Sequence, residues 1–402
     1  MSEAFICDAV RTPIGRYGGI LAEIRADDLG ALPMKALLAR NPDLDPGAIE
    51  EVFYGCANQS GEDNRNVARM SLLLAGLPHT VPGVTFNRLC ASGLEAVGAA
   101  ARAIRANEMA LALAGGVESM TRAPFVIGKA EGAFGRGQKL EDTTMGWRFV
   151  NPMLDALYGT EAMPRTGENV AEDYGISRND QDAFALRSQQ RAITAQQNGF
   201  HAAEIVPVAV RGKRKGETVE VSVDEHPRAD TTFETLARLK PLFGPSGTVT
   251  AGNASGINDG SAALIIASEA AARQHGITPR ARILGLASAG VEPRIMGVGP
   301  IPATRKLMER LGLTITDFDA IELNEAFASQ SLAVLRGLGL ADDAPHVNAN
   351  GGAIALGHPL GMSGARLAMT LVHQLERTNG KRGLATLCVG VGMGLALAVE
   401  RV

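Results

Sequence analysis

The stretch Val84-Thr-Phe-Asn-Arg-Leu-Cys90-Ala-Ser-Gly-Leu-Glu-Ala96 predicts a short strand, a sharp turn that carries one cysteine, and a helix. Apolar residues recur at helical spacing from there, at Leu94, Val97 and Ile104. A thiol at a helix N-terminus meets free backbone N–H groups and the positive end of the macrodipole, so we expect a lowered pKa for Cys90. Cys90 is therefore a candidate nucleophile, and the alternative is a small buried hydrophobic residue.

Size and composition favour an enzyme or binding protein for small molecules. The chain has 402 residues, enough for more than one domain, with 46% hydrophobic and 20% charged residues. Its net charge of −4 offers no basic field for a nucleic acid or an anionic membrane. No apolar run of the sequence reaches transmembrane length and residues 1–8 lack a signal-peptide pattern, so we expect a cytoplasmic protein with no membrane partner.

The four cysteines, Cys7, Cys56, Cys90 and Cys388, lie far apart and form no C-x-x-C pair. This spacing argues against a disulfide framework and against a thiolate zinc site. We therefore expect reduced thiols and no bound metal.

Alternating strand and helix patterns over the first 120 residues are typical of a parallel α/β sheet. Between residues 121 and 248 the sequence carries more charge and most of the aromatic residues, which predicts an inserted subdomain. It includes an amphipathic helix at 177–197 with Ser177 as its N-cap. Its basic run at 211–216 predicts a solvated hairpin turn, or alternatively a phosphate site. The α/β pattern returns at residue 249.

Three units are predicted from these changes in character: residues 1–120 with 249–275, the insert 121–248, and residues 276–402. The segments 87–104 and 350–375 each run from an Asn-bearing turn through Ser-Gly into an apolar helix. This echo indicates two halves of like topology.

Three further turns hold polar or reactive side chains where strands or helices end, at residues 324–327, 357–364 and 388–394. His358 precedes a proline in a loop, and Cys388 ends an apolar strand. Each side chain fits a catalytic role or ordinary packing when it is considered singly.

Taken together, six motifs resemble the thiolase (acetyl-CoA acyltransferase) family over the whole chain. The motifs are Asn87-Arg-Leu-Cys-Ala-Ser-Gly93, Gly115-Gly-Val-Glu-Ser-Met120, Ala251-Gly-Asn-Ala-Ser-Gly-Ile-Asn-Asp-Gly260, Asn324-Glu-Ala-Phe327, Asn350-Gly-Gly-Ala-Ile-Ala-Leu-Gly-His-Pro359 and Cys388-Val-Gly-Val-Gly-Met-Gly394. The resemblance implies a thiolase fold: an α/β architecture of two similar halves in α-β-α-β-α layers, with an inserted loop subdomain that covers coenzyme A. It also implies a homotetramer.

The resemblance implies a role for each reactive group. Cys90 would accept the acyl group, His358 would take its proton, and Cys388 would be the second acid and base. Asn324 would hold a water that helps His358 to stabilise an enolate, and the backbone N–H groups of Gly390 and Cys90 would hold the acyl oxyanion. No resident cofactor is implied, because coenzyme A and acyl-CoA are the substrates.

For coenzyme A, the resemblance points to five residues: Ser255, Ala251, Met163, Arg228 and Phe243. A His-Met pair found in some biosynthetic thiolases appears here as Ala162-Met163. The segments 147–152 and 224–228 resemble instead the 3-oxoadipyl-CoA thiolases of aromatic-compound catabolism, which form succinyl-CoA and acetyl-CoA.

The sequence also leaves activities other than 3-oxoadipyl-CoA cleavage as alternatives. An acetoacetyl-CoA thiolase or a broad 3-ketoacyl-CoA thiolase is the alternative within the family. A non-catalytic acyl-CoA-binding protein could dispense with the reactive groups, and a ketoacyl synthase is expected to have a histidine or an asparagine in place of Cys388. A dicarboxylic substrate needs a cation for its far carboxylate, for which Arg148 is the first candidate and Arg165 the second. Arg228 is assigned to a phosphate of coenzyme A.

Overall fold

The main sheet has ten strands in the part of the chain that the computed structural model describes, residues 2–212, 214 and 216–402. Its strands are β1 (Ala4–Arg11), β2 (Gly15–Arg16), β3 (Glu51–Gly55), β4 (Gly83–Phe86), β5 (Leu111–Ser119), β10 (Asn258–Ser268), β11 (Ala281–Gly290), β12 (Ala320–Leu323), β13 (Arg382–Val389) and β14 (Met393–Arg401). Hydrogen bonds connect them in the order β12-β13-β14-β11-β1-β10-β5-β3-β4, and β2 pairs with β10.

The strand pairing repeats in the two halves of this sheet. In the first half β3 runs parallel to β4 and β5, and β10 lies antiparallel between β5 and β1. In the second half β12 pairs in parallel with β13 and, through a single bridge from Ile321, with Val347. The strand β14 lies antiparallel between β13 and β11. The halves meet where β1 pairs briefly with β11. The predicted like topology of the halves is thus confirmed. Within the first 120 residues β3, β4 and β5 pair in parallel as predicted, and the antiparallel pairs of the two halves come from β10 and β14, later in the chain.

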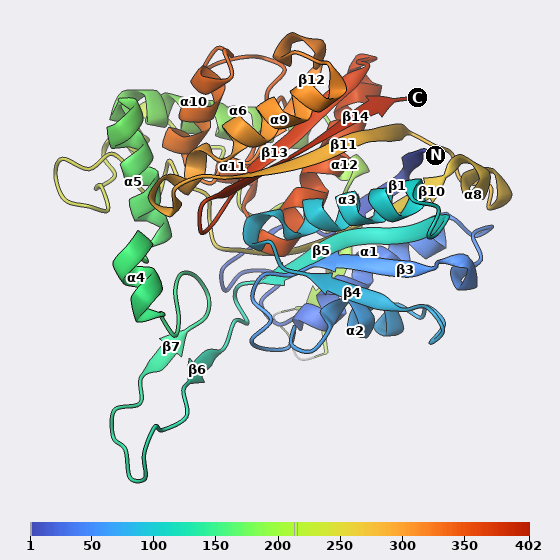
Figure 1. Ribbon diagram of the computed structural model, residues 1–402, viewed down its shortest axis with the longest axis horizontal. Coiled ribbons are helices and arrows are strands. Elements are labelled where there is room, and N and C mark those ends of the chain that lie inside the picture. Colours follow the sequence, from blue (N-terminus) through green and yellow to red (C-terminus); the bar gives the residue numbers. More distant parts are fainter. Residues whose placement is uncertain (1, 213, 215) are drawn as a thin grey trace.

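The helices form three layers around these strands. The helices are α1 (Ala26–Arg40), α2 (Val67–Leu74), α3 (Ser92–Arg105), α8 (Glu269–Gln274), α9 (Pro300–Leu311), α10 (Ala328–Gly337), α11 (Ala353–Leu356) and α12 (Leu360–Thr378). The pair α3 and α12 contacts strands of both halves, α1 and α2 pack on the first half, and α9 packs on the second (Figure 1). This arrangement confirms the predicted α-β-α-β-α order. Among the described residues, no helix combines the length and the apolar character that crossing a membrane requires.

Close backbone approach holds the central layer together. A Cβ atom added to Gly93 in α3 would lie 2.5 Å from the carbonyl oxygen of Gly361 and 2.9 Å from the backbone nitrogen of Ala365, both in α12. Only glycine permits that distance between the two helices. Their N-termini, which follow Cys90 and His358 in the chain, are therefore pressed together between the two half-sheets.

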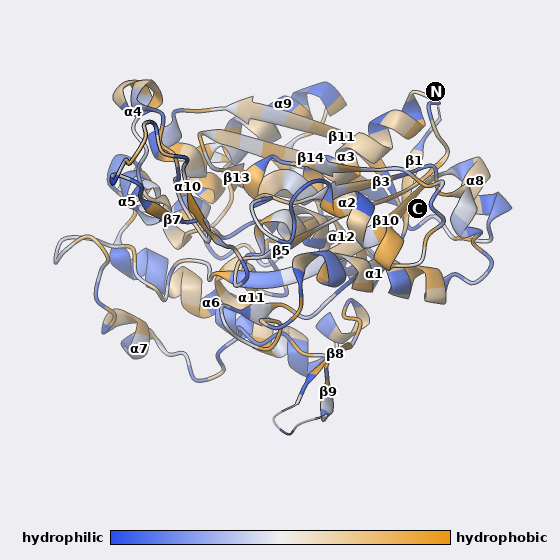
Figure 2. Cartoon of the chain, turned by 90° about the horizontal axis from the view of Figure 1, so that it is seen from below, coloured by the Kyte–Doolittle hydropathy of each residue, from blue (hydrophilic) through white to orange (hydrophobic). Residues whose placement is uncertain are grey.

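The segment 121–248 contributes helices and two small hairpins outside the main sheet. Its elements are β6 (Phe125–Ile127), β7 (Leu140–Asp142), α4 (Pro152–Tyr158), α5 (Met163–Tyr174), α6 (Arg178–Gln197), β8 (Val208–Arg211), β9 (Thr218–Val221) and α7 (Phe233–Ala237). The β6–β7 arm projects far from the body (Figure 1), and the β8–β9 hairpin forms a second projection (Figure 2). The predicted cap of α6 is present, because the backbone nitrogen of Asp180 donates to the Ser177 hydroxyl at 3.1 Å.

The hairpin predicted at residues 211–216 is supported by its flanking strands β8 and β9, which pair antiparallel. Lys213 and Lys215 lie outside the described residues. The unit boundaries proposed at residues 120, 248 and 275 stay predictions.

Candidate active site

Cys90 lies in a short 3-10 helix, Leu89–Ala91, between β4 and α3. The side-chain oxygen of Asn87 accepts a hydrogen bond from the Leu89 nitrogen at 3.0 Å, and the Ser92 hydroxyl donates to the Leu89 carbonyl at 2.6 Å. Leu89 has a φ of 47°, a left-handed conformation that costs free energy in a residue other than glycine. The polar residues around the turn thus hold the cysteine in a strained and defined position.

The turn between β13 and β14 reaches the same thiol. A Cβ added to Gly390 would lie 3.0 Å from the Leu89 side chain, and the backbone N–H of Gly390 is near enough to the Cys90 thiol to lower its pKa. The next residue, Val391, has a φ of 64°, which is unusual for a β-branched side chain. Two residues other than glycine therefore have left-handed backbone conformations here: Leu89, next to Cys90, and Val391, next to Gly390.

The predicted lowering of the Cys90 pKa is wrong for this resting site. Burial raises the pKa of the thiol to about 11, although backbone N–H groups, including that of Gly390, act in the other direction. Cys90 also precedes the first residue of α3 by two positions, so it is not at the end of the helix itself. The site consequently holds a protonated thiol near neutral pH, and a base must remove its proton before it can attack.

Cys388 is the last residue but one of β13 and is fully buried. Burial raises the pKa of this thiol, and the neighbouring Cys90 sulfur raises it further. Met163, at the start of α5, packs against the small apolar cluster that contains Cys388 and Phe327. The structure thus places a second neutral thiol near the first.

His358 lies in the loop between α11 and α12, where three polar contacts orient it. Its backbone nitrogen donates to the side-chain oxygen of Asn258 at 3.0 Å. Its Nδ1 lies 2.6 Å from the Ser363 hydroxyl oxygen, and its Nε2 lies 3.3 Å from the Nδ2 of Asn324. Burial, aided by the positive charge of Arg366, lowers the pKa of His358 to about 3, so the imidazole is neutral and able to accept a proton.

Asn324 follows β12 directly and is fully buried. Its Oδ1 atom has no hydrogen-bond partner within the described part of the chain. Buried carboxamide oxygens are ordinarily paired, so this acceptor is available to a water or a substrate group.

The residues assigned to coenzyme A occupy two regions. The backbone nitrogen of Ser255 donates to the Ala326 carbonyl at 3.0 Å, so the turn that contains Ser255 and the exposed Ala251 lies against the Asn324–Phe327 turn. The Met163 sulfur is 3.9 Å from the position that a Cβ would take on Gly390. These contacts bring part of the predicted coenzyme A set next to the reactive groups.

Arg228 and Phe243 lie in the inserted segment. Arg228 is exposed, and its backbone nitrogen donates to the Gln189 side chain at 2.8 Å. The Phe243 ring lies 5.7 Å from the Arg165 guanidinium. Among the described residues, neither is hydrogen-bonded to Cys90, His358 or Cys388.

The two arginines predicted for the far carboxylate have other contacts. Arg148 Nη2 donates to the Asn58 carbonyl oxygen at 3.3 Å. Arg165 pairs with Glu172 at 3.3 Å. Their role in substrate binding stays a prediction.

Sequence reasoning gave no role to Ser363, Asn258 or Glu118, although all three lie within or next to the quoted motifs. The signal for Ser363 was a hydroxyl five residues after His358, across the first turn of α12. For Glu118 it was a single acid in an otherwise apolar strand. Long-range contacts, which no local pattern contains, define what these side chains do.

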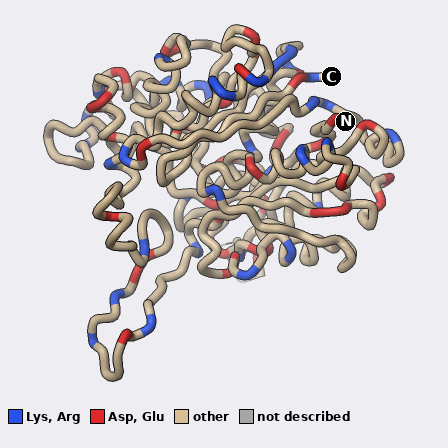
Figure 3. Tube along the Cα trace, in the orientation of Figure 1, with Lys and Arg blue, Asp and Glu red and all other residues tan. Residues whose placement is uncertain are grey.

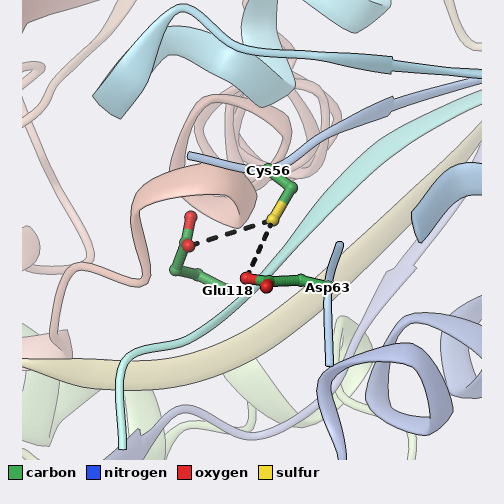
Figure 4. Close-up of side chains that lie close together, drawn as sticks. All are labelled: Cys56, Asp63 and Glu118. Carbon is green, nitrogen blue, oxygen red and sulfur yellow. Dashed lines mark hydrogen bonds between the residues drawn. The ribbon is translucent and has the colours of Figure 1, made fainter. Parts of the chain in front are cut away.

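Glu118 belongs to a buried cluster with Cys56 and Asp63 (Figure 4). Their ligand atoms lie within 4.8 Å of one another, a spacing that could hold a metal ion. All four carboxylate oxygens already accept backbone N–H groups, including that of Gly361 at 2.7 Å. Burial raises the pKa of Glu118 to about 7, although those N–H groups oppose the rise. The cluster therefore ties the start of α12 to the first half of the chain, and the expected absence of a metal stays a prediction.

Comparisons with known proteins agree with this architecture. Residues 4–270 match the family described as Thiolase, N-terminal domain, and residues 277–401 match Thiolase, C-terminal domain. The beta-ketoadipyl-CoA thiolase of Pseudomonas aeruginosa is 70% identical over 400 residues, which cover 100% of this chain and 99% of the relative. The 3-oxoadipyl-CoA/3-oxo-5,6-dehydrosuberyl-CoA thiolase of Escherichia coli (strain K12) is 64% identical over 402 residues and 100% of both chains.

A solved structure extends the agreement to three dimensions. The crystal structure of the Bacillus anthracis acetyl-CoA acetyltransferase superposes with a TM-score of 0.92 at 41% identity, covering 100% of this chain and 99% of that chain. The family matches and the paired half-sheets describe the same two-part fold, and the chain belongs to the thiolase family.

Proposed function

We propose that this protein cleaves 3-oxoadipyl-CoA with coenzyme A to give succinyl-CoA and acetyl-CoA. The thiolase chemistry rests on one geometric observation, the 3.3 Å contact between His358 Nε2 and the side-chain nitrogen of Asn324, whose side-chain oxygen is left unpaired among the described residues. The choice of substrate rests on the 70% and 64% identity to relatives named for this reaction over essentially their whole lengths. Both observations favour an enzyme over a non-catalytic acyl-CoA-binding protein.

In the first step His358 accepts the Cys90 proton on Nε2, and the thiolate attacks the C3 carbonyl carbon of the substrate. The oxygen of that carbonyl gains the charge, and the backbone N–H groups of Gly390 and Cys90 stabilise it. The C2–C3 bond then breaks, leaving a succinyl thioester on Cys90 and the enolate of acetyl-CoA. His358 and a water held by Asn324 stabilise the enolate oxygen.

In the second step the Cys388 thiol protonates the enolate carbon, and acetyl-CoA leaves. Free coenzyme A then gives its thiol proton to the Cys388 thiolate and attacks the succinyl thioester. Cys90 departs as the thiolate and takes its proton back from His358, and succinyl-CoA forms. No oxidant, reductant or metal enters this balance, so coenzyme A and acyl-CoA are substrates and we propose no resident cofactor. The protonated resting state of both thiols suits this order, because each starts with the proton that it must give away.

We place coenzyme A along Ser255, Ala251 and Met163, with Arg228 and Phe243 toward the nucleotide. The Ser255 turn supports this assignment through its contact with the Asn324–Phe327 turn. We also place the enzyme in the cytoplasm, where reducing conditions would preserve its four free cysteines.

We propose a homotetramer held together through the β6–β7 arm. Apolar side chains are exposed along the arm, among them Phe125 at 65% and Phe134 at 100%. Charged residues lie along the same arm (Figure 3), so it combines apolar contacts with polar ones. Light scattering should give four chain masses for the wild type and fewer for a Phe125→Asp, Phe134→Asp double variant. Val219→Asp on the β8–β9 hairpin is the matched control, and an unchanged mass in both variants would remove the arm from the interface.

The alternative is an acetoacetyl-CoA thiolase, since the similar Bacillus anthracis structure is that of an acetyl-CoA acetyltransferase. Purified enzyme should be assayed for coenzyme A-dependent cleavage of 3-oxoadipyl-CoA and acetoacetyl-CoA side by side. We expect kcat/KM to favour 3-oxoadipyl-CoA by roughly tenfold or more, the scale at which a specific polar contact discriminates substrates. A preference for acetoacetyl-CoA would replace the proposed substrate with the alternative.

A further inference from the structure

A solvent-open pocket lies beside the Gly390 turn, and one cation lines it among the described residues. The side chains that matter for its chemistry are Trp147, Tyr158, Glu161, Met163, Arg294 and Val391. They come from the segment before α4, the end of α4, the connection between α4 and α5, the start of α5, the 3-10 helix after β11, and the β13–β14 turn. The walls are mainly aromatic and apolar, with an arginine and a glutamate as the charged groups.

Two wall residues connect this pocket to the reacting atoms. Val391 follows Gly390, and a Cβ added to Gly390 would lie 3.0 Å from the side chain of Leu89, the residue before Cys90. Met163 packs against the cluster that contains Cys388. An acyl chain bound to Cys90 with its thioester oxygen at Gly390 therefore has the pocket next to it.

Arg294 is held so that part of its guanidinium remains free. Its Nη1 donates to Asp173 Oδ2 at 2.6 Å, and this is the one hydrogen bond of its side chain to the described residues. The Asn169 side-chain nitrogen donates both to the Arg294 carbonyl oxygen at 3.0 Å and to Glu161 Oε2 at 2.6 Å. The backbone is thus fixed, while Nε and Nη2 are left to form the two parallel bonds that a carboxylate accepts from arginine.

Because of the charges around the pocket, the binding of an anionic ligand there depends on Arg294. The hydrogen bond to Asp173 raises the pKa of Arg294, so the side chain stays positively charged. Glu161 would repel a second carboxylate in the same pocket. Without Arg294, the pocket would therefore select against a dicarboxylic acyl chain and accept a neutral one.

We propose that Arg294 binds the terminal carboxylate of the acyl chain and so determines the specificity of the enzyme for dicarboxylic 3-oxoacyl-CoA substrates. The proposal rests on the proposed 3-oxoadipyl-CoA cleavage and names the residue behind it. It replaces the earlier candidates, because Arg148 contacts the Asn58 carbonyl and Arg165 pairs with Glu172, and neither lines this pocket.

The test compares 3-oxoadipyl-CoA with 3-oxohexanoyl-CoA, which has the same six-carbon chain with a methyl group in place of the carboxylate. Arg294→Gln should lower kcat/KM for 3-oxoadipyl-CoA by about 10- to 100-fold, the range for losing a hydrogen bond to a charged group. It should leave 3-oxohexanoyl-CoA cleavage close to the wild-type value. Arg294→Lys, which keeps the charge without the fork, should recover part of the loss.

Arg273→Gln, which removes an exposed arginine of α8 that pairs with Glu269, is the matched control and should leave both substrates unchanged. Equal losses on the two substrates in Arg294→Gln would overturn the proposal, as would a selective loss in Arg148→Gln alone. Because these comparisons start from a wild type that prefers 3-oxoadipyl-CoA, they separate the role of Arg294 from the choice of substrate. A wild type without that preference would overturn the proposed function and this inference together.

Discussion

The Nδ1 atom of His358 lies 2.6 Å from the hydroxyl oxygen of Ser363, and the same hydroxyl lies 2.7 Å from the Pro359 carbonyl oxygen. A serine hydroxyl has one proton, and the carbonyl can only accept it. With that proton directed to Pro359, the hydroxyl oxygen accepts from Nδ1–H of His358. The proton on Nδ1 leaves Nε2 as the unprotonated nitrogen, consistent with its 3.3 Å contact to the Asn324 carboxamide nitrogen.

This relationship predicts that Ser363 orients the base without touching the substrate. Ser363→Ala should slow acylation of Cys90 by roughly tenfold, a part of the 10²–10⁴ that a general base contributes. Single-turnover acylation by acyl-CoA measures the effect. Ser363→Thr keeps the hydroxyl and should restore most of the rate, so equal rates in the alanine variant and the wild type, or no rescue by threonine, would contradict this role.

The raised pKa of Cys90 predicts an unusual pH dependence of its alkylation. With a pKa of about 11, the thiolate is a minor form below that pH and its fraction rises about tenfold for each pH unit. Iodoacetamide labelling of the Cys90 peptide, followed by mass spectrometry, should therefore keep accelerating from pH 7 to pH 9. A plateau near pH 7 would instead indicate a stable thiolate in the resting enzyme.

Substitution of Cys388 should distinguish its role from that of Cys90. Cys388→Ala should still be acylated on Cys90 by succinyl-CoA, but the release of acetyl-CoA from 3-oxoadipyl-CoA should fall by about 10²–10⁴, because the general acid that protonates the enolate is missing. Mass spectrometry measures the adduct, and release of acetyl-CoA measures cleavage. Cys7→Ala removes another buried thiol and is the control. Cleavage at the wild-type rate in Cys388→Ala would reduce Cys388 to a packing residue.

The local features of the fold were predictable from the sequence because they depend on neighbours in the chain. The strand, turn and helix around Cys90 follow from apolar spacing, and the start of α6 follows from Ser177. Strand direction was not predictable in the same way. The strands β1, β5 and β10 are buried on both faces, so their continuous apolar sequences read alike whether they pair parallel or antiparallel.

The site was predictable in its reactive residues and less so in their environment. The motif resemblance identified Cys90, His358, Cys388 and Asn324 as candidate catalytic residues. It could not give the pKa of Cys90, because that pKa depends on burial by segments far away in the chain. Arg294 was missed for the same reason. It lies between Pro293 and Ile295 in an unremarkable stretch, and only folding places it beside Met163 and Val391.

The last prediction concerns the junction that holds His358 in place. Gly361, in the first turn of α12, donates its N–H to Glu118 at 2.7 Å, and a Cβ added there would lie 2.7 Å from the Gly55 carbonyl oxygen and closer still to that of Val117. Backbone atoms cannot move aside as a flexible side chain can. Gly361→Ala should therefore lower the free energy of unfolding by about 1–3 kcal/mol or more, the usual cost of overpacking.

The same displacement would move α12 and the loop before it, so Gly361→Ala should also slow acylation of Cys90. Denaturant unfolding and single-turnover acylation measure the two effects. Gly290→Ala is the control, because the nearest atom to its added Cβ is 3.8 Å away, an ordinary contact. If Gly361→Ala unfolds and acylates as the control does, the first turn of α12 can shift without disturbing the site, and the close approach at Gly361 does not position His358.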